Sequence, residues 1–586
     1  MITDQLSVLL RQAVDSAVKD GELTVGDEPI VITFDTPKNK DFGDFATNVA
    51  MLLQKRAGLA PREIANRIIK RLPVGQSLIT RVEIAGPGFM NFYLNPVWLY
   101  DTMVSIERED TAYGNGNSRS GERTLIEFVS ANPTGPISVV NGRAAALGDC
   151  LANLLSAAGA VVEREFYIND ALNSTQINLM GISLQLRYLQ TLGHTLDMGD
   201  SSTDEEEEST PHACAKCGEN HIFPKEGYRG EYLVEIAEQM AKEDNGALAA
   251  LPATDQAAKF RQLASDRMIL QQQSDLAAFG VKFDKWFYES SLYEKGEVST
   301  AIELMKSKGY AYEKDGALWL KTTELSKDDQ DRVLVRSNDK ETYISADAAY
   351  HKNKFDRGFN RLINIWGADH HGYVQRLKAG VSSLGYDQDK CEIILTQMIL
   401  LMRDGEPVRG SKRAGDIIPL VDLVNEIGRD AARYYCLLNS YETTATFDLE
   451  LAKRQSSDNP VFYAQYAHAR AASLLAQAIS RGVEIKAAAD IDLTLLTDER
   501  ELGLLRKLSD FPSEVKLAGD FLAPHRLTGY IREVGQALHQ FYEECPTLKE
   551  GVDPAVRDAR IALFNVTRIV VRNLLALLGV SAPDKM

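Results

Sequence analysis

The sequence predicts an α/β protein in which a parallel-sheet domain lies between an N-terminal α+β domain and a C-terminal all-α bundle. Its 586 residues exceed the usual domain size of about 150 residues. An apolar run, a helical pattern and a second apolar run form a strand–helix–strand unit at Thr124–Val129, Asn141–Ala158 and Val161–Ile168. Helical periodicity is almost unbroken from Leu451 to the end. We therefore expect domains at residues 1–115, 116–450 and 451–586.

The first of these domains shows both helical and strand patterns. Helical spacing runs through Gln5–Val18 and Phe45–Leu72, and alternating apolar stretches follow at Leu78–Ile84 and Phe89–Leu94. Residues 113–121 are rich in Gly, Ser and Asn, which predicts a linker to the parallel-sheet domain.

Composition is that of a globular protein. Hydrophobic residues make up 44% of the chain and charged residues 25%, close to the averages for soluble proteins. There is no apolar run of about 18 residues, and Met1–Gln12 lacks the pattern of a signal peptide, so we expect no membrane contact and a cytoplasmic location. The six cysteines are too scattered for a disulfide framework.

The net charge of −18 argues against nucleic-acid binding, because phosphate contacts usually leave a basic footprint. The excess of acidic residues is, however, uneven. Acidic and basic side chains are equal in number from Lys453 to Met586, and part of the excess elsewhere comes from one segment, Asp204–Glu208. The charge therefore weakens a nucleic-acid function without excluding it.

Three loops carry candidate chemistry. In the first, Ser138 and Asn141 lie three residues apart at a predicted helix start, where both can donate hydrogen bonds to a phosphate; the alternative is that they only cap the helix. In the second, Arg409, Lys412 and Arg413 between glycines can close over a polyphosphate; the alternative is a charged surface turn.

The third loop, residues 366–373, follows an apolar strand and contains Asp369, His370 and His371. These side chains can bind a metal, exchange protons or hold a ribose, and the small residues before Asp369 let a flat ligand approach the backbone. A structural histidine is the alternative.

The order and flanks of these loops resemble the class I aminoacyl-tRNA synthetases, and within them the arginyl-tRNA synthetase family. The stretch Glu127–Pro136 is similar to the lead-in to the first class I signature, and Ser411–Gly415 to the second half of the Lys-Met-Ser-Lys loop. The resemblance runs almost end to end, apart from an acidic insertion near 195–224, and extends to the following segments: Thr342–His351, Gly367–Tyr373, Gly428–Tyr434, Asp458–Arg470, Gly43–Asn48, Gly86–Asn91 and Leu577–Pro583.

The resemblance implies a Rossmann-type catalytic domain that joins L-arginine to ATP, with Mg²⁺ in the substrate complex, and transfers the arginyl group to arginine tRNA. It assigns arginine binding to Glu127, Ser130, Asn132, Tyr343, Asp347 and Gln375. It assigns ATP binding to Pro133, Thr134, Gly135, Gly367, Asp369, His370 and Ser411. It assigns the catalytic contacts to Ser138, Asn141, Arg409 and Lys412.

Two departures separate the chain from the usual family pattern. The first signature normally reads His-x-Gly-His, and here the positions are Ser138-Val-Val-Asn141. Arg409 and Gly410 stand where Lys and Met are usual. Neutral hydrogen bonds contribute about 0.5–1.5 kcal/mol against about 1.5–3 for charge-assisted ones. Two interpretations follow: a working synthetase, favoured by the intact guanidinium pocket, or a paralogue that binds arginine tRNA but is catalytically impaired or inactive.

The remaining expectations concern partners. The resemblance implies that the N-terminal domain meets the tRNA D-loop and the bundle meets the anticodon, with contacts from Phe89, Asn91, Tyr463, Gln465, Tyr466 and His468, in a protein that acts as a monomer. Phe89 as a core residue is the alternative. Within the insertion, a Cys-x₂-Cys pair with two histidines is compatible with Zn²⁺, at His212, Cys214, Cys217 and His221.

Overall fold

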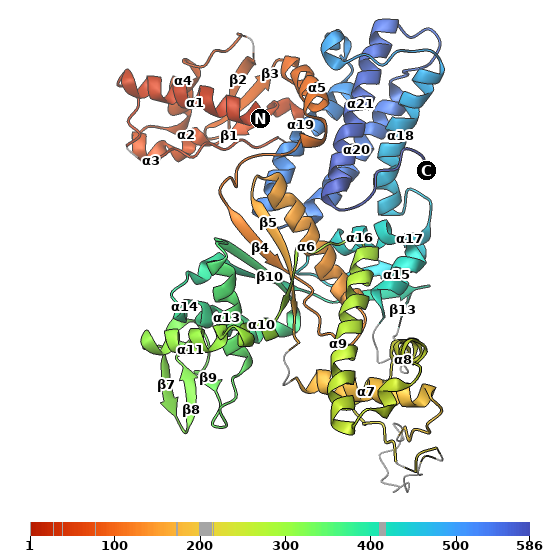
Figure 1. Cartoon of the computed structure of the whole chain (residues 1–586). Helices are drawn as coiled ribbons and strands as arrows, with labels where there is room; N and C mark the ends of the chain where they lie inside the picture. The colour runs from red at the N-terminus through yellow and green to blue at the C-terminus, as the bar shows by residue number, and fades with distance from the viewer. Residues whose placement is uncertain are drawn as a thin grey trace.

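The computed structural model describes residues 2–26, 28–37, 39–76, 78–170, 174–198, 214, 216–218, 220–408 and 418–586. The molecule is elongated, with the N-terminal domain and the C-terminal bundle side by side at one end and the parallel sheet near the middle (Figure 1). Two further bodies extend from the opposite side of the sheet, one around α7–α9 and one around α10–α14 (Figure 1).

The central sheet is parallel and five-stranded in the order β11-β10-β4-β5-β6. Its strands are β4 (Arg123–Glu127), β5 (Val161–Ile168), β6 (Lys285–Tyr288), β10 (Arg361–Gly367) and β11 (Cys391–Thr396). The chain moves from β4 to β5 on one side and returns as β10 on the other side of β4. In such sheets ligands bind beyond the carboxyl ends of the strands at this reversal. The sheet confirms the predicted Rossmann-type fold class.

Helix α6 (Val139–Ala157) joins β4 to β5, and it begins at Val139 rather than at the expected Asn141. It is buried along most of its length, so its apolar side chains face neighbours on several sides. Gly148 lets the helix lie close to the sheet, because a Cβ there would fall 2.3 Å from the ring of Phe128. This close packing holds the start of α6 beside the end of β4.

The N-terminal domain has an antiparallel sheet in the order β1-β3-β2, covered by helices. The predicted helix from Phe45 was wrong at its start: Phe45–Thr47 forms a strand because it pairs with β3, a contact that local periodicity cannot show. Its elements are α1 (Ile2–Lys19), β1 (Phe45–Thr47), α2 (Val49–Leu52), α3 (Gln54–Ala57), α4 (Pro61–Ile69), β2 (Ile79–Ala85), β3 (Phe89–Leu94) and α5 (Val97–Glu109).

Two bodies are inserted into the parallel sheet. The first, between β5 and β6, consists of α7 (Thr175–Thr191), α8 (Glu231–Asp244) and α9 (Ala253–Ala278) around a separate apolar core. The second, between β6 and β10, contains α10 (Ser290–Glu294), α11 (Glu297–Ser307), β7 (Ala311–Lys314), β8 (Ala317–Leu320), α12 (Thr322–Leu325), β9 (Arg332–Val335) and α13 (Tyr343–Asp356). Helix α14 (Val374–Ser383), between β10 and β11, packs on α13.

The rest of the chain leads into the bundle. After β11 come β12 (Ile399–Arg403), β13 (Glu406–Pro407), α15 (Leu420–Ile427), α16 (Arg429–Leu437), β14 (Ala445–Asp448) and α17 (Leu449–Lys453), and the bundle is made of α18 (Pro460–Ser480), α19 (Glu499–Asp520), α20 (His525–Glu544) and α21 (Pro554–Leu577). In the part of the chain that the structure describes, every helix is too short or too polar to cross a membrane.

The N-terminal domain, the sheet and the bundle share one continuous apolar core. Helix α5 packs against α19 and α21, and α6 packs against α16 and α19. The fully buried Arg433 guanidinium donates to Asp149 on α6 at 2.6 Å, which links α16 to the sheet. Removing the bundle would expose this core, so its function is better tested by surface substitutions than by deletion.

Candidate functional site

Polar side chains gather where β4 ends. Glu127, the last residue of β4, is buried, and Val129 and Ser130 follow with φ angles of 70° and 39°. Positive φ is strained for residues other than glycine, and for a β-branched valine especially so. The strained turn directs the Ser130 hydroxyl back to Glu127, to which it donates at 3.0 Å, and it accepts from the backbone of Tyr167 at 3.2 Å.

Two further carboxylates come from other elements. Asp347 comes from α13 and the buried Glu289 comes directly after β6. Burial, with the charge of Glu127 adding to it, raises the pKa of Asp347 to about 6, although a hydrogen bond from Tyr373 opposes the shift. Burial and then the charge of Asp347 raise the pKa of Glu289 to about 7. The charge of Glu127 thus reaches Asp347 and the charge of Asp347 reaches Glu289, so the three acids form one cluster, which we call the carboxylate pocket.

The cation nearest to this pocket is tied to Glu127. Lys354, fully buried on α13, donates to Glu127 at 2.6 Å and to Asn364 on β10 at 2.9 Å. Among the residues that the structure describes, no lysine or arginine forms an ion pair with Asp347 or Glu289. Among the described residues, cationic side chains therefore do not balance the negative charge of Asp347 and Glu289, which suits a cationic ligand.

Tyr373, which was not predicted, contacts Asp347, and the remaining predicted arginine-binding residues have other surroundings. The Tyr373 hydroxyl donates to Asp347 at 2.5 Å and so orients that carboxylate. Tyr343, at the start of α13, is 71% exposed and lies at the surface. Gln375 on α14 accepts from the backbone of Lys327 at 3.2 Å, and Asn132 donates to Gln176 on α7 at 2.7 Å.

Ser138 and Asn141 are brought together at the start of α6. The Ser138 hydroxyl donates to the Asn141 side chain at 2.7 Å and accepts from the Asn141 backbone at 3.2 Å, so the two residues form a capping box. The capping role raised as an alternative is thus present. Both side chains remain partly exposed, and a capped helix start still offers its backbone N–H groups to an anion.

Side chains of the α7–α9 body donate hydrogen bonds to backbone carbonyls of the first loop. Tyr232 on α8 donates through its hydroxyl to the Thr134 carbonyl at 2.8 Å. Gln272 on α9 donates to the carbonyls of Asn132 at 3.0 Å and Gly135 at 2.9 Å. The loop between Asn132 and Gly135 is therefore positioned by helices that come after it in the chain.

The second loop lies in part outside the described residues, which exclude Arg409, Ser411, Lys412 and Arg413. Its flanks are described. The backbone of Leu420 donates to Ile137 at 2.7 Å, and that of Val139 donates to Ile418 at 3.0 Å. This pairing places Ile418 and Leu420, which follow the second loop in sequence, beside the helix start that carries Ser138.

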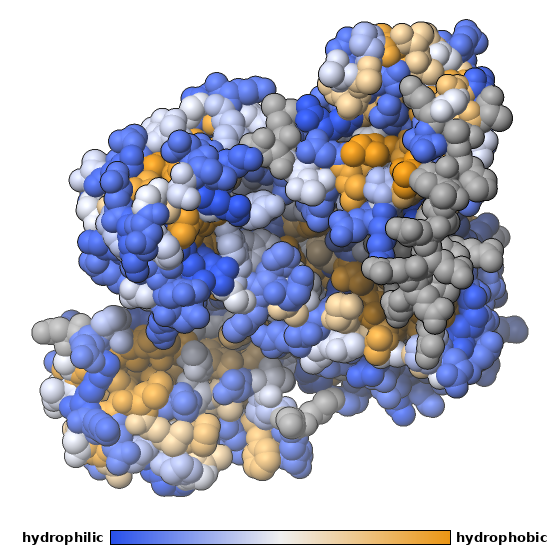
Figure 2. All heavy atoms as spheres, turned by 90° about the horizontal axis from the view of Figure 1, so that it is seen from below, coloured by the Kyte–Doolittle hydropathy of each residue, from blue (hydrophilic) through white to orange (hydrophobic). Residues whose placement is uncertain are grey.

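The third loop continues β10 as a 3₁₀ helix at Ala368–Tyr373. The side chains of Asp369 and His370 are 81% and 60% exposed and face each other at 3.6 Å. A Cβ on Gly367 would lie 2.4 Å from the Asp369 carboxylate, so the glycine lets this carboxylate fold back over the strand end. The surface between the two bodies that flank the sheet is hollowed in the view from below (Figure 2).

The predicted RNA contacts fall into exposed and buried sets. Tyr466 on α18 is 39% exposed, stacks on Phe462 at 5.9 Å, and shares the Arg470 guanidinium with Tyr542 on α20. We call Phe462, Tyr466, Arg470 and Tyr542 the aromatic cluster. Phe89 is 38% exposed at the start of β3, which does not favour a core role.

The remaining members of this predicted set lie deeper. Gln465 donates to Asp430 and to Ser581, and the buried His468 contacts the Pro583 carbonyl through Nδ1 at 3.0 Å, so both hold the C-terminal tail. Asn91 is buried in the N-terminal sheet, and Tyr463 packs beside Gly535.

Four potential metal ligands converge at the end of α7. They are His194, Cys214, Cys217 and His221. Three of them were expected, whereas His194 was missed and the expected His212 lies outside the described residues. His194 precedes Cys214 by 20 residues in sequence, so spacing alone could not associate it with the cysteines.

Glu289 and Tyr373 were also missed as site residues. The signal for Glu289 is a carboxylate just past the aromatic strand Lys285–Tyr288, the pattern that drew attention to Asp369. It was overlooked because this four-residue strand is not obvious from periodicity. Nothing in the sequence indicates that the Tyr373 hydroxyl meets Asp347.

Comparison with known proteins covers almost the whole chain. The family models that match are described as "Arginyl tRNA synthetase N terminal domain" at residues 4–94, "tRNA synthetases class I (R), catalytic domain" at 103–448 and "DALR anticodon binding domain" at 464–586. The chain is 44% identical over 585 residues to an arginine–tRNA ligase of Carboxydothermus hydrogenoformans, covering 100% of this chain and 99% of that one.

Two further comparisons agree. The chain is 40% identical over 588 residues to an arginine–tRNA ligase of Bacillus subtilis, covering 100% of both. The solved arginyl-tRNA synthetase of Thermus thermophilus superposes with a TM-score of 0.73 over 100% of both chains at 20% identity, which bears on the fold alone.

Proposed function

Because the chain belongs to the arginyl-tRNA synthetase family, we infer that its activity is that of an arginine–tRNA ligase. It is a class I aminoacyl-tRNA ligase that activates L-arginine with ATP and transfers the arginyl group to the 3′ end of arginine tRNA. The relatives that it matches over their full length favour this activity over an inactive paralogue.

The observation that carries this function in the molecule itself is the carboxylate pocket. Burial and the charge of Asp347 push Glu289 toward its neutral form, burial and the charge of Glu127 do the same to Asp347, and a bound guanidinium would oppose both shifts. A planar guanidinium also matches carboxylates geometrically, which a lysine ammonium does not. Arginine-dependent exchange of pyrophosphate into ATP, measured with and without arginine tRNA, tests the function; no exchange in either case would leave only the paralogue.

We propose that the reaction follows from how the two substrates would be placed. With the guanidinium held by Asp347 and Glu289, the arginine carboxylate would point along the edge of the sheet toward β4 and the start of α6. One of its oxygens forms a bond to the α-phosphorus of ATP, the bond from that phosphorus to the bridging oxygen breaks, and pyrophosphate leaves. Ordering the two reactants in this geometry supplies much of the rate.

We assign the ATP contacts to the loops at the sheet reversal. Mg–ATP would lie across β4 and β10, with its adenosine near Gly367, Asp369 and His370 and its phosphates near Pro133–Gly135 and the start of α6. Arg409, Ser411 and Lys412 would stabilise the charge that develops on the leaving pyrophosphate. The backbone hydrogen bonds of Ile418 with Val139 and of Leu420 with Ile137, at the start of α6, support this arrangement.

Replacing Ser138 with alanine is expected to slow activation. The change removes a helix cap, which costs about 0.5–2 kcal/mol of stability, and one neutral hydrogen bond to phosphate, which lowers the exchange rate on the order of tenfold. The measurement is pyrophosphate exchange together with thermal unfolding.

A matched control separates the two effects. Asp553 caps α21 through the backbone of Ala555 at 2.8 Å, far from the sheet edge. Asp553→Ala should lower stability by a similar amount and leave the exchange rate unchanged. Equal rates in Ser138→Ala and Asp553→Ala would remove Ser138 from the phosphate site.

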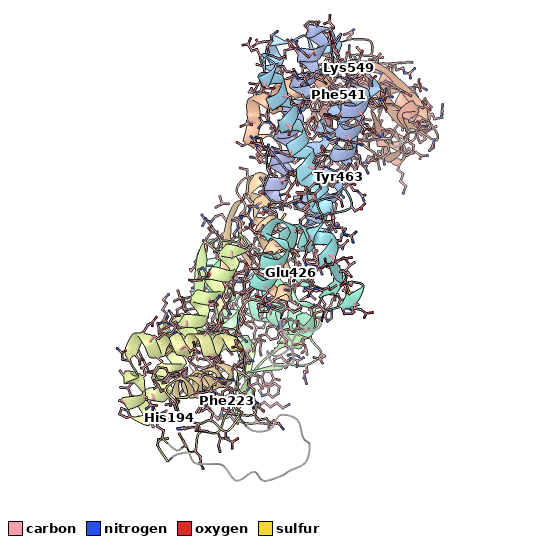
Figure 3. The ribbon with its side chains drawn as sticks, turned by 90° about the vertical axis from the view of Figure 1, so that its right-hand side faces the viewer. His194, Phe223, Glu426, Tyr463, Phe541 and Lys549 are labelled. Atoms are coloured by element: carbon pink, nitrogen blue, oxygen red, sulfur yellow. The ribbon has the colours of Figure 1, made fainter. Side chains whose placement is uncertain are left out.

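We propose that tRNA extends along the molecule, with its 3′ end at the sheet edge and its anticodon on the bundle. Figure 3 shows Tyr463 and Phe541 toward one end and His194 and Phe223 at the other. The aromatic cluster presents stacking surfaces and a cation, which single-stranded RNA requires. A cleft of about 590 Å³ beside it is lined by Arg429, Lys453 and Arg454, which suits phosphates.

Replacing Tyr466 with alanine is expected to weaken tRNA binding. One base–aromatic stack contributes about 1–3 kcal/mol, so the tRNA KM should rise roughly 5- to 100-fold, with the arginine KM unchanged. Aminoacylation kinetics at several salt concentrations measure both values, and binding should weaken steeply with salt.

Phe521, 68% exposed after α19, provides the control, because it is a still more accessible aromatic than Tyr466 and does not belong to the cluster. Phe521→Ala should leave the tRNA KM unchanged. If the two variants behave alike, the aromatic cluster does not bind tRNA.

The remaining assignments are also proposals. We place D-loop contact in residues 1–115 through Phe89 and Asn91, catalysis in 116–450 and anticodon contact in 451–586 through Tyr463, Gln465, Tyr466 and His468. The buried positions of Asn91 and His468 suit an indirect contribution, through the backbone that each of them supports. We further propose that the enzyme is a cytoplasmic monomer.

A further inference from the structure

We propose that His194, Cys214, Cys217 and His221 form a structural Zn²⁺ site that braces the α7–α9 body. This site goes beyond the ligase activity, because none of its residues lies at the sheet edge. It combines a histidine from the end of α7 with three ligands from the far side of the acidic insertion.

The ligand atoms already have the spacing of a metal site. All four lie within 4.8 Å of one another. Cys217 Sγ is 3.1 Å from His221 Nε2, and Cys214 Sγ is 3.7 Å from His194 Nδ1. Tetrahedral Zn²⁺ with bonds of about 2.0–2.3 Å separates its ligands by roughly 3.3–3.8 Å. Only small movements of the side chains would complete the tetrahedron.

The backbone around the cysteines is shaped for coordination. The Gly218 N–H donates to the Cys214 carbonyl at 2.7 Å, which closes a tight turn, and Gly218 adopts a φ of 77° that favours glycine. The backbone N–H of Thr195 donates to Cys214 Sγ at 3.3 Å. Such donors stabilise a thiolate and orient it, as outer-shell contacts do in known metal sites.

A second set of contacts brings the two histidines to the same place. The Asp197 N–H donates to the His221 carbonyl at 2.8 Å, and the Phe223 N–H donates to the Asp197 carbonyl at 2.8 Å. Segments 194–197 and 221–223 therefore run side by side. Their pairing and the cysteine turn are independent of each other, yet both direct a ligand atom to one point.

The donor set selects the metal. Two thiolates and two imidazoles suit Zn²⁺, whereas Mg²⁺ and Ca²⁺ take oxygen ligands. Four protein ligands leave no open position for a substrate, so the site is structural rather than catalytic. Cys214 is buried and Cys217 is exposed, which gives the ion an approach from solvent.

The position of the site gives it a consequence for the catalytic loop. The segment that follows His221 is fixed on α7, where Tyr228 donates to Ser183 at 3.0 Å and Phe223 packs beneath the guanidinium of Arg187 at 5.1 Å. It then enters α8, whose Tyr232 holds the Thr134 carbonyl. A metal that joins His194 to His221 would thus steady the support of the first loop.

The test is the metal content of the full-length enzyme, purified under reducing conditions without added chelator. We expect about one zinc per chain in the parent enzyme, and loss of that zinc in Cys217→Ser and in His194→Ala. Substitution with Co²⁺ should give the visible absorption bands of a tetrahedral thiolate site, and these bands should disappear in the same variants.

His212→Ala is the matched control, because it removes the other histidine near the cysteines. It should keep the zinc and the Co²⁺ bands. Parent enzyme without stoichiometric zinc, which also fails to take up Co²⁺, overturns the proposal, as does zinc that survives in His194→Ala but is lost in His212→Ala. Metal content and absorption are read without an activity assay, so failure here is distinct from failure of the ligase assignment.

Discussion

Replacing Asp347 with alanine is expected to raise the arginine KM on the order of 10²- to 10³-fold. Removing one partner of a desolvated charge pair costs about 3–5 kcal/mol, because the remaining charge is left without compensation. Asp347 is oriented for this contact by the Tyr373 hydroxyl at 2.5 Å, and it lies close enough to Glu289 to raise the pKa of that carboxyl. Arginine-dependent pyrophosphate exchange measures the change, and thermal unfolding checks that the fold is intact.

Asp356 is the matched control, since it lies on the same helix but pairs with Lys352 at 2.5 Å on the outer face. Asp356→Ala should leave the arginine KM within about twofold, because an exposed ion pair contributes little. An unchanged arginine KM in Asp347→Ala would remove this residue from the guanidinium site.

The pH dependence of arginine binding gives a second readout of the same pocket. With pKa values of about 6 for Asp347 and about 7 for Glu289, both acids take up protons as the pH falls from 8 to 5.5. A guanidinium binds their ionised forms, so the arginine KM should rise over this range. Asp347→Asn removes one of these titrations and should flatten the profile.

The raised pKa values of Asp347 and Glu289 also determine how the stability of the fold changes with pH. Because the folded-state pKa values are raised, the ligand-free fold holds more protons than the unfolded chain between about pH 4 and 7, so these groups stabilise it less as the pH rises. Arginine, which binds the ionised carboxylates, should therefore increase the melting temperature more at pH 7.5 than at pH 5.5.

Replacing Lys354 with methionine is expected to destabilise the fold by about 3–5 kcal/mol. The fully buried ammonium bonds to Glu127 and Asn364 and lies 4.1 Å from the centre of the Tyr350 ring. Without it, Glu127 stays buried beside Asp347 with no opposing charge. Denaturant unfolding measures the loss of stability. The lost cation also raises the pKa of Asp347, so the rise in arginine KM should begin at a higher pH.

Lys352→Met provides the comparison, because Lys352 lies two residues earlier on α13 and forms only the exposed pair with Asp356. It should change stability by no more than about 0.5 kcal/mol. Equal losses in Lys352→Met and Lys354→Met would show that the buried pair with Glu127 is not what stabilises this region.

Much of the fold was predictable because the apolar periodicity of a segment often agrees with the element that it forms in the folded protein. The second strand of the unit, Val161–Ile168, and the N-terminal strand Phe89–Leu94 are observed with the predicted bounds. The start of the predicted helix at Phe45 was wrong because pairing with Met90–Phe92 overrides helical spacing there. The short strand β6 escaped notice for a related reason, since its four residues are too few to show a period.

The candidate site residues likewise divide into those that the sequence could indicate and those that only the fold brings together. Asp347 and Glu127 could be named from the sequence because they lie within stretches that resemble a family pattern. Glu289 could not, because it comes from a segment 58 residues before Asp347 that only the sheet topology brings into the same pocket. His194, just after α7, is a similar case, because only the fold brings it close to Cys214, Cys217 and His221.

By itself, the sequence determined the family, the parallel-sheet fold and the arginine and ATP chemistry, and it predicted which loops carry that chemistry, because these depend on residue types at short spacings. Only the tertiary structure decided that Asp347 comes within reach of Glu289 and that Lys354 pairs with Glu127. Repulsion, desolvation and ion pairing act over a few ångströms in space, and the chain brings such neighbours together across tens or hundreds of residues.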